Sequence, residues 1–409
     1  MKSFRSLTEE KNTHMTHIED SVFIQGVDGT RQAIDYIRQM RDTLNGHAAS
    51  PIKTSVKWDG APAIFLGRDP TDGQFFVAKK GLFNKTPLLY KSLAEIDQAS
   101  ELSTELKRKF KLAFNGYKNA GIQNIIQGDF LYDGEEVKKE SIQGSDYIVF
   151  HPNTIVYAVP VGSPLARRIL NSTFGIVWHT TYTGNAIESL KASYGVKMPK
   201  ADSKVFQVDA MYKDLSGSAS LTASESADLQ KMLSRIGTLF RKVQPRSFDI
   251  FKIPELQQMA LTYTNSFIRN RQKMNPNEAA VGFVHYITDV MKKEEDKRST
   301  PKGKTSVRQK FQPIMKAITG VPKVQLMAMF EIYDLISQSK LVLIRKLNSG
   351  QFMNTFLRTD KGYQVTGQEG FVAIDRLGKN AVKLVDRLEF SFANFDASVI
   401  KGWQSATRK

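Results

Sequence analysis

The chain has 409 residues, 41% of them hydrophobic, which is enough to bury a substantial core in two or three domains. It has no cysteine, which excludes disulfide bonds, thiolate metal sites and cysteine nucleophiles, and its six histidines lack the spacing of a metal site. No apolar run approaches the ~20 residues of a membrane-spanning helix, and the first residues contain no signal-peptide core, so we expect a cytoplasmic protein with no membrane partner. The net charge of +17 instead favours a polyanionic partner, for which nucleic acid is the usual candidate.

The first part of the chain alternates between helical and strand patterns. Apolar residues recur at spacings of three and four between Gly26 and Gly46, which predicts an amphipathic helix. Residues 55–65 predict a strand, a tight turn and a second strand, and residues 92–120 predict another helix. Further strands are predicted at residues 73–81, 125–132, 147–150, 154–159, 175–180 and 205–208.

The pattern becomes helical after a flexible connection at residues 216–220. The sequence from Thr222 to Glu225 has the form of a capping box, which opens a helix. Residues 292–304 are too charged for a core, so they predict an exposed loop. Helices are predicted at residues 225–243, 254–273, 277–295, 306–318 and 322–347.

Strands return after residue 350 and continue to Phe390, and they are too few to form a stable unit alone. We therefore predict an α+β fold in which a helical block interrupts one domain of antiparallel sheets with helices. Residues 1–215 would form the first part of that domain and residues 349–409 would complete it. Residues 216–348 would form the all-α insertion.

The predicted turn carries the sequence Lys57-Trp58-Asp59-Gly60. Residues two apart in a strand point to the same face, so we expect Lys57 and Asp59 to share a pocket. A lysine acts as a covalent nucleophile where burial or cationic neighbours lower its pKa. The four residues resemble motif I (Lys-x-Asp-Gly) of the covalent nucleotidyltransferases, which include ATP-dependent DNA ligases, RNA ligases and mRNA capping enzymes. The resemblance implies an ATP-grasp-like adenylation domain in which Lys57 and Asp59 are catalytic, Lys57 carries AMP, and Val56 and Gly60 border the nucleotide.

Further segments resemble later motifs of this family, in the family's order. Ala78-Lys79-Lys80-Gly81 resembles motif Ia, which implies that Lys79 or Lys80 contacts phosphates or the nucleic-acid backbone. Gly128-Asp129 resembles motif III with Asp in place of the commoner Glu, which implies that Asp129 contacts ribose or a metal. Motif IIIa supplies an aromatic ring that stacks on the base, and Phe150 and Tyr157 are both candidates.

Two segments near the end of the chain resemble motifs IV and V. Gln368-Glu369-Gly370-Phe371-Val372 implies that Glu369 joins Asp129 in holding a divalent metal. Ala381-Val382-Lys383-Leu384-Val385 implies a catalytic contact between Lys383 and the α-phosphate, with Arg387 as a further phosphate or nucleic-acid contact. AMP transfer needs a cation on the phosphates and fixed positive charge where the transition state gains negative charge. Motif V usually has two lysines separated by one residue, whereas here Lys383 has no such partner.

The resemblance as a whole implies an ATP-dependent polynucleotide ligase that uses ATP and Mg²⁺, acts as a monomer and joins nucleic-acid ends. Nicked DNA is favoured because Lys-x-Asp-Gly is the usual DNA-ligase form, with RNA ligase as the alternative because some RNA ligases share it. The helical insertion would clamp the nucleic acid. Other hypotheses are a non-catalytic nucleic-acid-binding protein that kept the fold, a capping guanylyltransferase, and a transferase that modifies a protein or small molecule. The compact, cysteine-free chain would suit a phage enzyme acting in the host cell.

Overall fold

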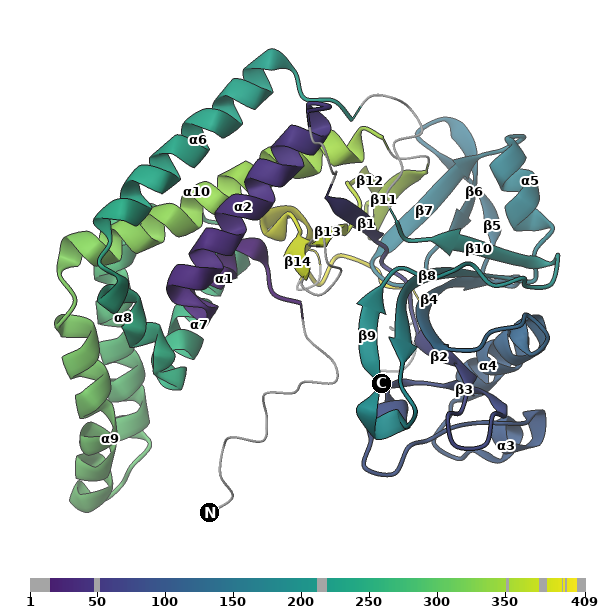
Figure 1. Cartoon of the computed structure of the whole chain (residues 1–409), viewed down its shortest axis with the longest axis horizontal. Helices are drawn as coiled ribbons and strands as arrows, with labels where there is room; N and C mark the ends of the chain where they lie inside the picture. Colours follow the sequence, from purple (N-terminus) through teal and green to yellow (C-terminus); the bar gives the residue numbers. More distant parts are fainter. Residues whose placement is uncertain are drawn as a thin grey trace.

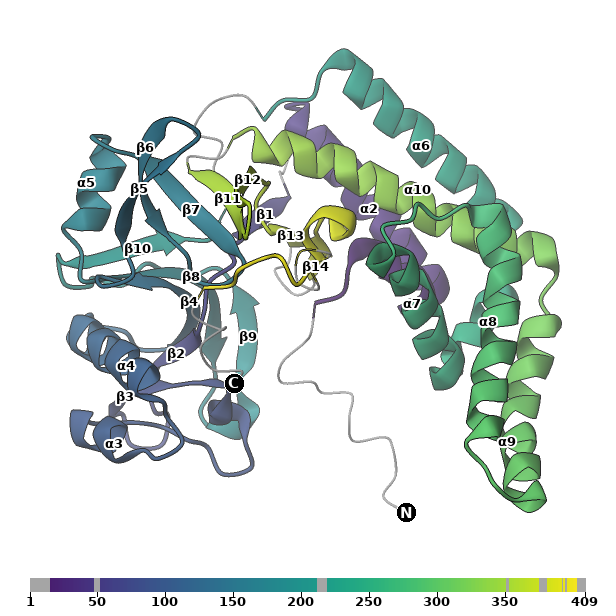
Figure 2. The same cartoon turned by 180° about the vertical axis from the view of Figure 1, so that it is seen from behind.

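The computed structural model describes residues 15–47, 52–211, 219–350, 353–374, 381–391, 393 and 396–402. Its strands gather on one side of the molecule and its long helices on the other, as the two opposite views in Figures 1 and 2 show. The fold is therefore a mixture of helices and largely antiparallel sheets, as the α+β prediction requires. None of the helices in these residues is both long enough and apolar enough to span a membrane.

Two sheets form most of the strand-rich side. In the six-stranded sheet only the pairing of β10 with β8 is parallel, and in the five-stranded sheet every pairing is antiparallel. The six-stranded sheet has the order β10 (Val205–Asp209), β8 (Phe174–Thr183), β4 (Ile125–Asp133), β2 (Ala63–Arg68) and β3 (Phe75–Ala78), with β9 (Lys191–Tyr194) beside β8. The five-stranded sheet has the order β12 (Gly362–Val365), β11 (Asn354–Thr359), β7 (Ile155–Pro160), β6 (Ser145–Phe150) and β5 (Lys138–Ile142).

A three-stranded sheet joins the two ends of the described chain. Its order is β1 (Lys53–Lys57), β13 (Gly370–Ile374) and β14 (Ala381–Leu384), and all its pairings are antiparallel. One face packs into the core through Phe371, Ala373 and Val382, all of which are buried. The late strands thus pair with strands from the first part of the chain, as their small number predicts.

The helices beside the six-stranded sheet differ from the prediction. Residues 92–120 form two helices, α3 (Leu93–Gln98) and α4 (Thr104–Tyr117), and not one. The break occurs because Ser103 starts a new helix, where its hydroxyl accepts a hydrogen bond from the Leu106 N–H at 3.3 Å. A short helix that the prediction lacked, α5 (Pro164–Leu170), follows β7.

The long helices form a unit that we call the helical arm (residues 223–348). Thr222 and Glu225 form the predicted capping box at its start. Its helices are α6 (Ala223–Lys242), α7 (Pro254–Arg269), α8 (Pro276–Asp296), α9 (Pro301–Thr319) and α10 (Lys323–Asn348), with a 3-10 segment at Pro245–Lys252.

The exposed loop predicted at residues 292–304 is wrong in its extent. Helix α8 continues to Asp296 and α9 begins at Pro301, so only a short turn separates them. Thr300 caps α9, because its hydroxyl accepts a hydrogen bond from the Gly303 N–H at 3.1 Å. The lysines and arginines of this stretch remain exposed, since each helix buries only one of its faces.

The predicted first helix is present as α2 (Gly26–Leu44), preceded by the one-turn α1 (Ser21–Ile24). Both pack on the helical arm, with α2 beside α6 and α10 (Figure 1), and α2 also contacts β1, where the Thr54 hydroxyl donates to Sδ of Met40 at 3.4 Å. Phe23 anchors this packing, because its ring lies 4.8 Å from Phe251, 5.4 Å from Phe330 and 5.2 Å from Tyr333. The start of the described chain is therefore built into the arm.

Candidate active site

A cavity of about 350 Å³ is lined by residues from the three-stranded and the six-stranded sheets. This volume lies within the range of small-molecule sites. Its polar lining combines three lysines with one carboxylate and one imidazole, and two tyrosines add aromatic surface. These residues are Lys57, Lys80, Lys383, Asp129, His179, Tyr182 and Tyr194.

Strand register brings Lys57 and Lys383 to the same cavity. Ser55 lies opposite Val372 and Val372 lies opposite Lys383, so these three side chains share one face of the three-stranded sheet. Lys57 is two residues from Ser55 and points to that face as well. All four residues line the cavity, which places the resembling segments of motifs I, IV and V side by side.

Gly370 allows β14 to pack closely against β13. It lies opposite Lys57 in the pairing of β1 with β13, and its φ of +150° is a conformation that side chains rarely adopt. A Cβ atom at this position would lie 2.4 Å from the carbonyl oxygen of Leu384 in the neighbouring strand. The glycine therefore permits close approach of β14, which carries Lys383.

The Lys57 ammonium forms an ion pair with the Glu369 carboxylate. Burial raises the pKa of Glu369 to about 7, against the opposing effect of the Lys57 charge, and nearby Asp59 raises it further. Burial also lowers the pKa of Lys383, and the charge of Lys57 lowers it further. Two lysines thus lie near one half-buried carboxylate, and an anion bound in the cavity would reduce the repulsion between the two lysines.

Asp59 does not line the cavity, so the expectation that it shares a pocket with Lys57 is wrong. The strand ends at Lys57, and the alternation of side chains ends with it. The buried Asp59 carboxylate instead accepts hydrogen bonds from Asn153 Nδ2 at 2.8 Å, the Thr154 N–H at 2.5 Å and the Ile155 N–H at 2.7 Å. Burial raises the pKa of Asp59 and these donors lower it. Asp59 thus fastens the turn after β1 to the connection between β6 and β7.

Phe150 and Tyr157 do not fit the expected base platform. Both are buried in the core, where their rings stack with centroids 5.3 Å apart, and neither lines the cavity. The Tyr157 hydroxyl accepts a hydrogen bond from the Asp59 N–H at 2.8 Å, which holds the ring inside. The aromatic rings at the cavity are Tyr182 and Tyr194 from β8 and β9, together with Trp58.

Sequence reasoning missed Tyr182 and Tyr194, although it predicted a strand at residues 175–180. In β8, His179 and Thr180 line the cavity although Trp178 beside them is fully buried. A β-bulge between Gln127 and Gly128 of β4 shifts the pairing at this point. That shift is a tertiary feature which no alternation in the sequence encodes.

The expected phosphate contacts separate into one that lines the cavity and two that do not. Lys80 lines it, whereas the Lys79 ammonium donates to the carbonyl oxygen of Glu101 at 3.3 Å. The expected phosphate contact of Arg387 is wrong, because its guanidinium is buried and forms an ion pair with Asp20 at 2.9 Å. Both Val56 and Asp129 border the cavity. A Cβ atom on Gly60 would lie 2.6 Å from Cβ of Asp129, so glycine lets the turn rest on β4.

The two carboxylates expected to hold Mg²⁺ belong to different elements, because Asp129 lies on β4 and Glu369 lies directly before β13. The Asp129 carboxylate is 3.5 Å from Nε2 of His179, and the Glu369 carboxylate contacts Lys57. Among the described residues, no group of three or more histidine, cysteine or acidic side chains could hold a metal ion. Mg²⁺ at nucleotide sites needs only one or two carboxylates, because the phosphates supply further ligands. Asp129, which lines the cavity, therefore fits a metal that arrives with a nucleotide, whereas Glu369 is paired with Lys57 and is not among the residues that line the cavity.

Comparisons with known proteins place the chain in a family without assigning an activity. Searches of curated proteins and of solved structures found no match. A model of a family of unknown function (DUF6267) matches residues 12–399. Because that match covers nearly the whole chain, the protein belongs to the DUF6267 family.

Proposed function

We propose that this protein is an ATP-dependent polynucleotide ligase that works through a lysyl-AMP intermediate on Lys57. The observation that carries the proposal is the meeting of Lys57, Glu369 and Lys383 at the three-stranded sheet. These residues come from opposite ends of the chain, and the sequence singles them out by separate motifs. The meeting of these three residues beside a cavity with a positively charged lining supports a site that binds ATP, a nucleoside triphosphate, and transfers its AMP.

In the first step, neutral Nζ of Lys57 attacks the α-phosphorus of ATP. A P–N bond forms, the bond between the α-phosphorus and its bridging oxygen breaks, and pyrophosphate leaves. Glu369 contacts the Lys57 ammonium and has a pKa of about 7, which suits it to accept the proton that Lys57 must lose. Mg²⁺ bound to the phosphates would neutralise the charge on the leaving group.

Lys383 and Lys80 supply fixed positive charge at the cavity, where the transferring phosphoryl group would gain negative charge. In the second step, a 5′-phosphate oxygen of the nucleic acid attacks the phosphorus of lysyl-AMP and the P–N bond breaks. In the third step, a 3′-hydroxyl attacks that activated 5′-phosphate and releases AMP. The proton lost by the hydroxyl is free to leave with solvent, and Asp129 stands at the cavity as a contact for ribose or metal.

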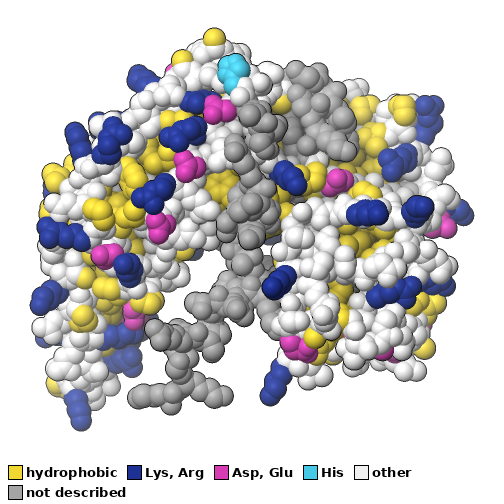
Figure 3. All heavy atoms as spheres, in the orientation of Figure 1, with side chains coloured by type: hydrophobic (Ala, Val, Ile, Leu, Met, Phe, Trp, Pro, Cys, Tyr) yellow, Lys and Arg dark blue, Asp and Glu magenta, His cyan; other side chains and the backbone are white. Residues whose placement is uncertain are grey.

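The helical arm supports nucleic acid as the partner. Residues 223–348 contain 22 Lys and Arg against 11 Asp and Glu. The hairpin of α8 and α9, which forms the free end of the arm, exposes many of these cations (Figure 3). Its exposed lysines include Lys292, Lys293, Lys302, Lys304, Lys310 and Lys316. A clamp of this kind holds the phosphate backbone through charge and reads no sequence.

The test is incubation of the protein with Mg²⁺ and ATP labelled at the α-phosphate, followed by measurement of covalent label. We expect label on the wild type and none on Lys57→Ala. Lys57→Arg is the matched variant, because it keeps the positive charge and loses the nucleophile, and it should also take no label. Nicked DNA, nicked RNA and single-stranded RNA ends then identify the substrate, with GTP as the alternative donor.

A folded protein that carries no pre-bound AMP and takes no label from ATP, GTP or NAD would contradict the ligase proposal. The isolated lysine of the motif V segment would then favour a non-catalytic nucleic-acid-binding protein. Label that persists on Lys57→Ala would contradict the assignment of the nucleophile.

A further inference from the structure

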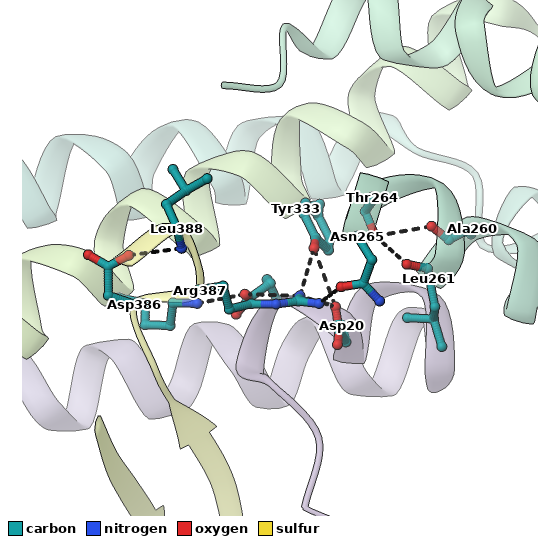
Figure 4. A network of polar contacts seen from close by, with 11 residues as sticks. Asp20, Ala260, Leu261, Thr264, Asn265, Tyr333, Asp386, Arg387 and Leu388 are labelled. Atoms are coloured by element: carbon teal, nitrogen blue, oxygen red, sulfur yellow. Dashed lines mark hydrogen bonds and ion pairs between the residues drawn. The ribbon is translucent and has the colours of Figure 1, made fainter. Parts of the chain in front are cut away.

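A buried polar network joins the start of the described chain, the helical arm and the segment that follows β14 (Figure 4). Nη1 of Arg387 donates to Oδ1 of Asp20 at 2.9 Å and to the Tyr333 hydroxyl at 3.1 Å. Nη2 of the same guanidinium donates to Oδ1 of Asn265. Asn265 lies on α7 and Tyr333 on α10, so a single arginine contacts two helices of the arm.

A second ion pair extends the network along α10. The Lys340 ammonium donates to Oε1 of Glu19 at 2.6 Å, and Nη1 of Arg387 lies 3.4 Å from the same oxygen. The side chains of Glu19 and Lys340 are each only 1% exposed. Water therefore cannot replace a lost partner, and leaving one of these charges alone in the interior is strongly unfavourable. The network is consequently stable only when the arm and the two chain segments are docked together.

The same two segments are tied to Lys383. The Lys383 N–H donates to the carbonyl oxygen of Thr16 at 2.9 Å, and His17 forms a parallel β-bridge with Lys383. Residues 16–20 and 383–387 therefore run side by side. A backbone hydrogen bond joins them at the end that borders the cavity, and the ion pair of Arg387 with Asp20 joins them at the end inside the arm. The position of Arg387 thus fixes the segment that presents Lys383.

We propose that Arg387 is a positioning residue that couples the binding of a nucleotide in the cavity to the binding of nucleic acid on the helical arm. Through it, docking of the helical arm holds Lys383 at the cavity, so nucleic acid bound to the arm changes the affinity of the cavity for a nucleotide. The proposal rests on the proposed function, because it takes the arm as the nucleic-acid site and the cavity as the nucleotide site. By thermodynamic linkage the effect is reciprocal, and nucleotide binding changes the affinity for nucleic acid by the same factor.

The geometry explains why lysine cannot replace this arginine. Separate nitrogens of one planar guanidinium serve Asp20 and Tyr333 on one side and Asn265 on the other. A lysine keeps the charge but has a single nitrogen on a flexible stem, so it cannot hold both helices at once. Arg387→Lys therefore removes the coupling without leaving the carboxylates unpaired.

The experiment uses calorimetry to measure the dissociation constant of the protein for α,β-methylene-ATP in the presence of Mg²⁺. The measurement is made with and without a saturating concentration of a nicked DNA duplex. For the wild type we expect the duplex to change this constant by about fivefold or more, the usual lower range of coupling between sites. For Arg387→Lys and for Tyr333→Phe we expect a change of less than about twofold, with an unaltered affinity for the duplex alone. Arg38→Lys, at an exposed ion pair with Asp35 on α2, is the matched control and should behave as the wild type.

Two results would overturn the proposal: no effect of the duplex in the wild type, or an undiminished effect in folded network variants. Tyr333→Phe removes only the hydroxyl that contacts Arg387, so it still tests the coupling if Arg387→Lys does not fold. The methylene bridge prevents AMP transfer, so the measurement does not depend on chemistry at Lys57. A protein that shows the coupling but takes no covalent label would refute the ligase and leave the coupling standing.

Discussion

The surroundings of Glu369 favour its protonated form. Burial raises its pKa from 4.5 to about 7 although Lys57 is in contact with it. Between these two values the folded protein binds the Glu369 proton and the unfolded chain does not. The free energy of unfolding therefore falls as the pH rises through this window.

Glu369→Gln removes this proton and its pH dependence. Between pH 5 and pH 8 we expect the wild type to lose about 2 to 3 kcal/mol more unfolding free energy than the variant, because one pKa unit corresponds to about 1.4 kcal/mol. Thermal and denaturant unfolding at the two pH values measure the difference. The exposed Glu188→Gln is the control and should follow the wild type. Parallel pH curves for wild type and Glu369→Gln would mean that Glu369 is ionised throughout.

Asp59 and Lys57 are expected to differ in role, with Asp59 contributing to stability and Lys57 to the chemical step. Asp59→Ala deprives the donors of Asn153, Thr154 and Ile155 of this acceptor inside the protein. We expect the free energy of unfolding to drop by about 2 to 4 kcal/mol, since each donor that loses its partner costs about 1 kcal/mol or more. Lys57→Ala, at a side chain that is 25% exposed, should change stability little and abolish labelling. A fully stable Asp59→Ala that fails to label would place Asp59 in the chemistry.

The sequence located Lys57 and Lys383 correctly on strands, because strand alternation is a local property, whereas Glu369 lies directly before β13 and not on it. It could not place Asp59, Phe150, Tyr157 or Arg387. Asp59 follows the last residue of its strand, where alternation no longer applies. The rings of Phe150 and Tyr157 face a core that forms only in three dimensions, and the ion pairs of Arg387 are with residues from the other end of the chain.

At the scale of elements, the pairing of β13 with β14 depends on glycine at one position. Gly370→Ala would place a Cβ atom 2.4 Å from the Leu384 carbonyl oxygen, so β14 must shift. Gly362→Ala is the matched control, because Gly362 has a φ of +110° and nothing lies within 4 Å of its added Cβ.

For Gly362→Ala we expect a loss of about 1 kcal/mol in unfolding free energy, from backbone strain alone. For Gly370→Ala we expect a loss above about 3 kcal/mol together with weaker labelling, because β14 carries Lys383. Denaturant unfolding and the labelling assay measure the two effects. Equal losses in the two variants would show that β14 accommodates the extra atom.

Element prediction failed where local signals and charge gave conflicting answers. The charged stretch at residues 292–304 resembles a loop in composition, yet Thr300 and Pro301 carry the signals that start a helix. The capping box could be predicted from the sequence because its two residues, Thr222 and Glu225, lie within one turn of helix. The packing of α2 on α6 and α10 could not be predicted, because the sequence of an amphipathic helix does not indicate which element covers its apolar face.

At the scale of the whole molecule, the charge of the helical arm predicts the salt dependence of nucleic-acid binding. Replacing Lys302, Lys304, Lys310 and Lys316 by glutamine should reduce the slope of log K against log salt concentration by about 3 to 4, if each lysine contacts a phosphate. The control replaces four exposed lysines of the strand-rich side, Lys118, Lys197, Lys200 and Lys204. Fluorescence anisotropy with a labelled nicked duplex at several salt concentrations provides both slopes. Equal slopes for the two quadruple variants would place the nucleic acid away from the hairpin.

The pairing of β1 with β13 also constrains when the protein can become active. A ribosome makes β1 long before β13, and the whole helical arm emerges between them. During that interval Lys57 has neither Glu369 beside it nor Lys383 across the sheet. If the proposed reaction takes place on Lys57, it has to wait until translation has passed β14. In that case the order of synthesis would prevent premature AMP transfer, since only a chain whose helical arm is already made could carry AMP on Lys57.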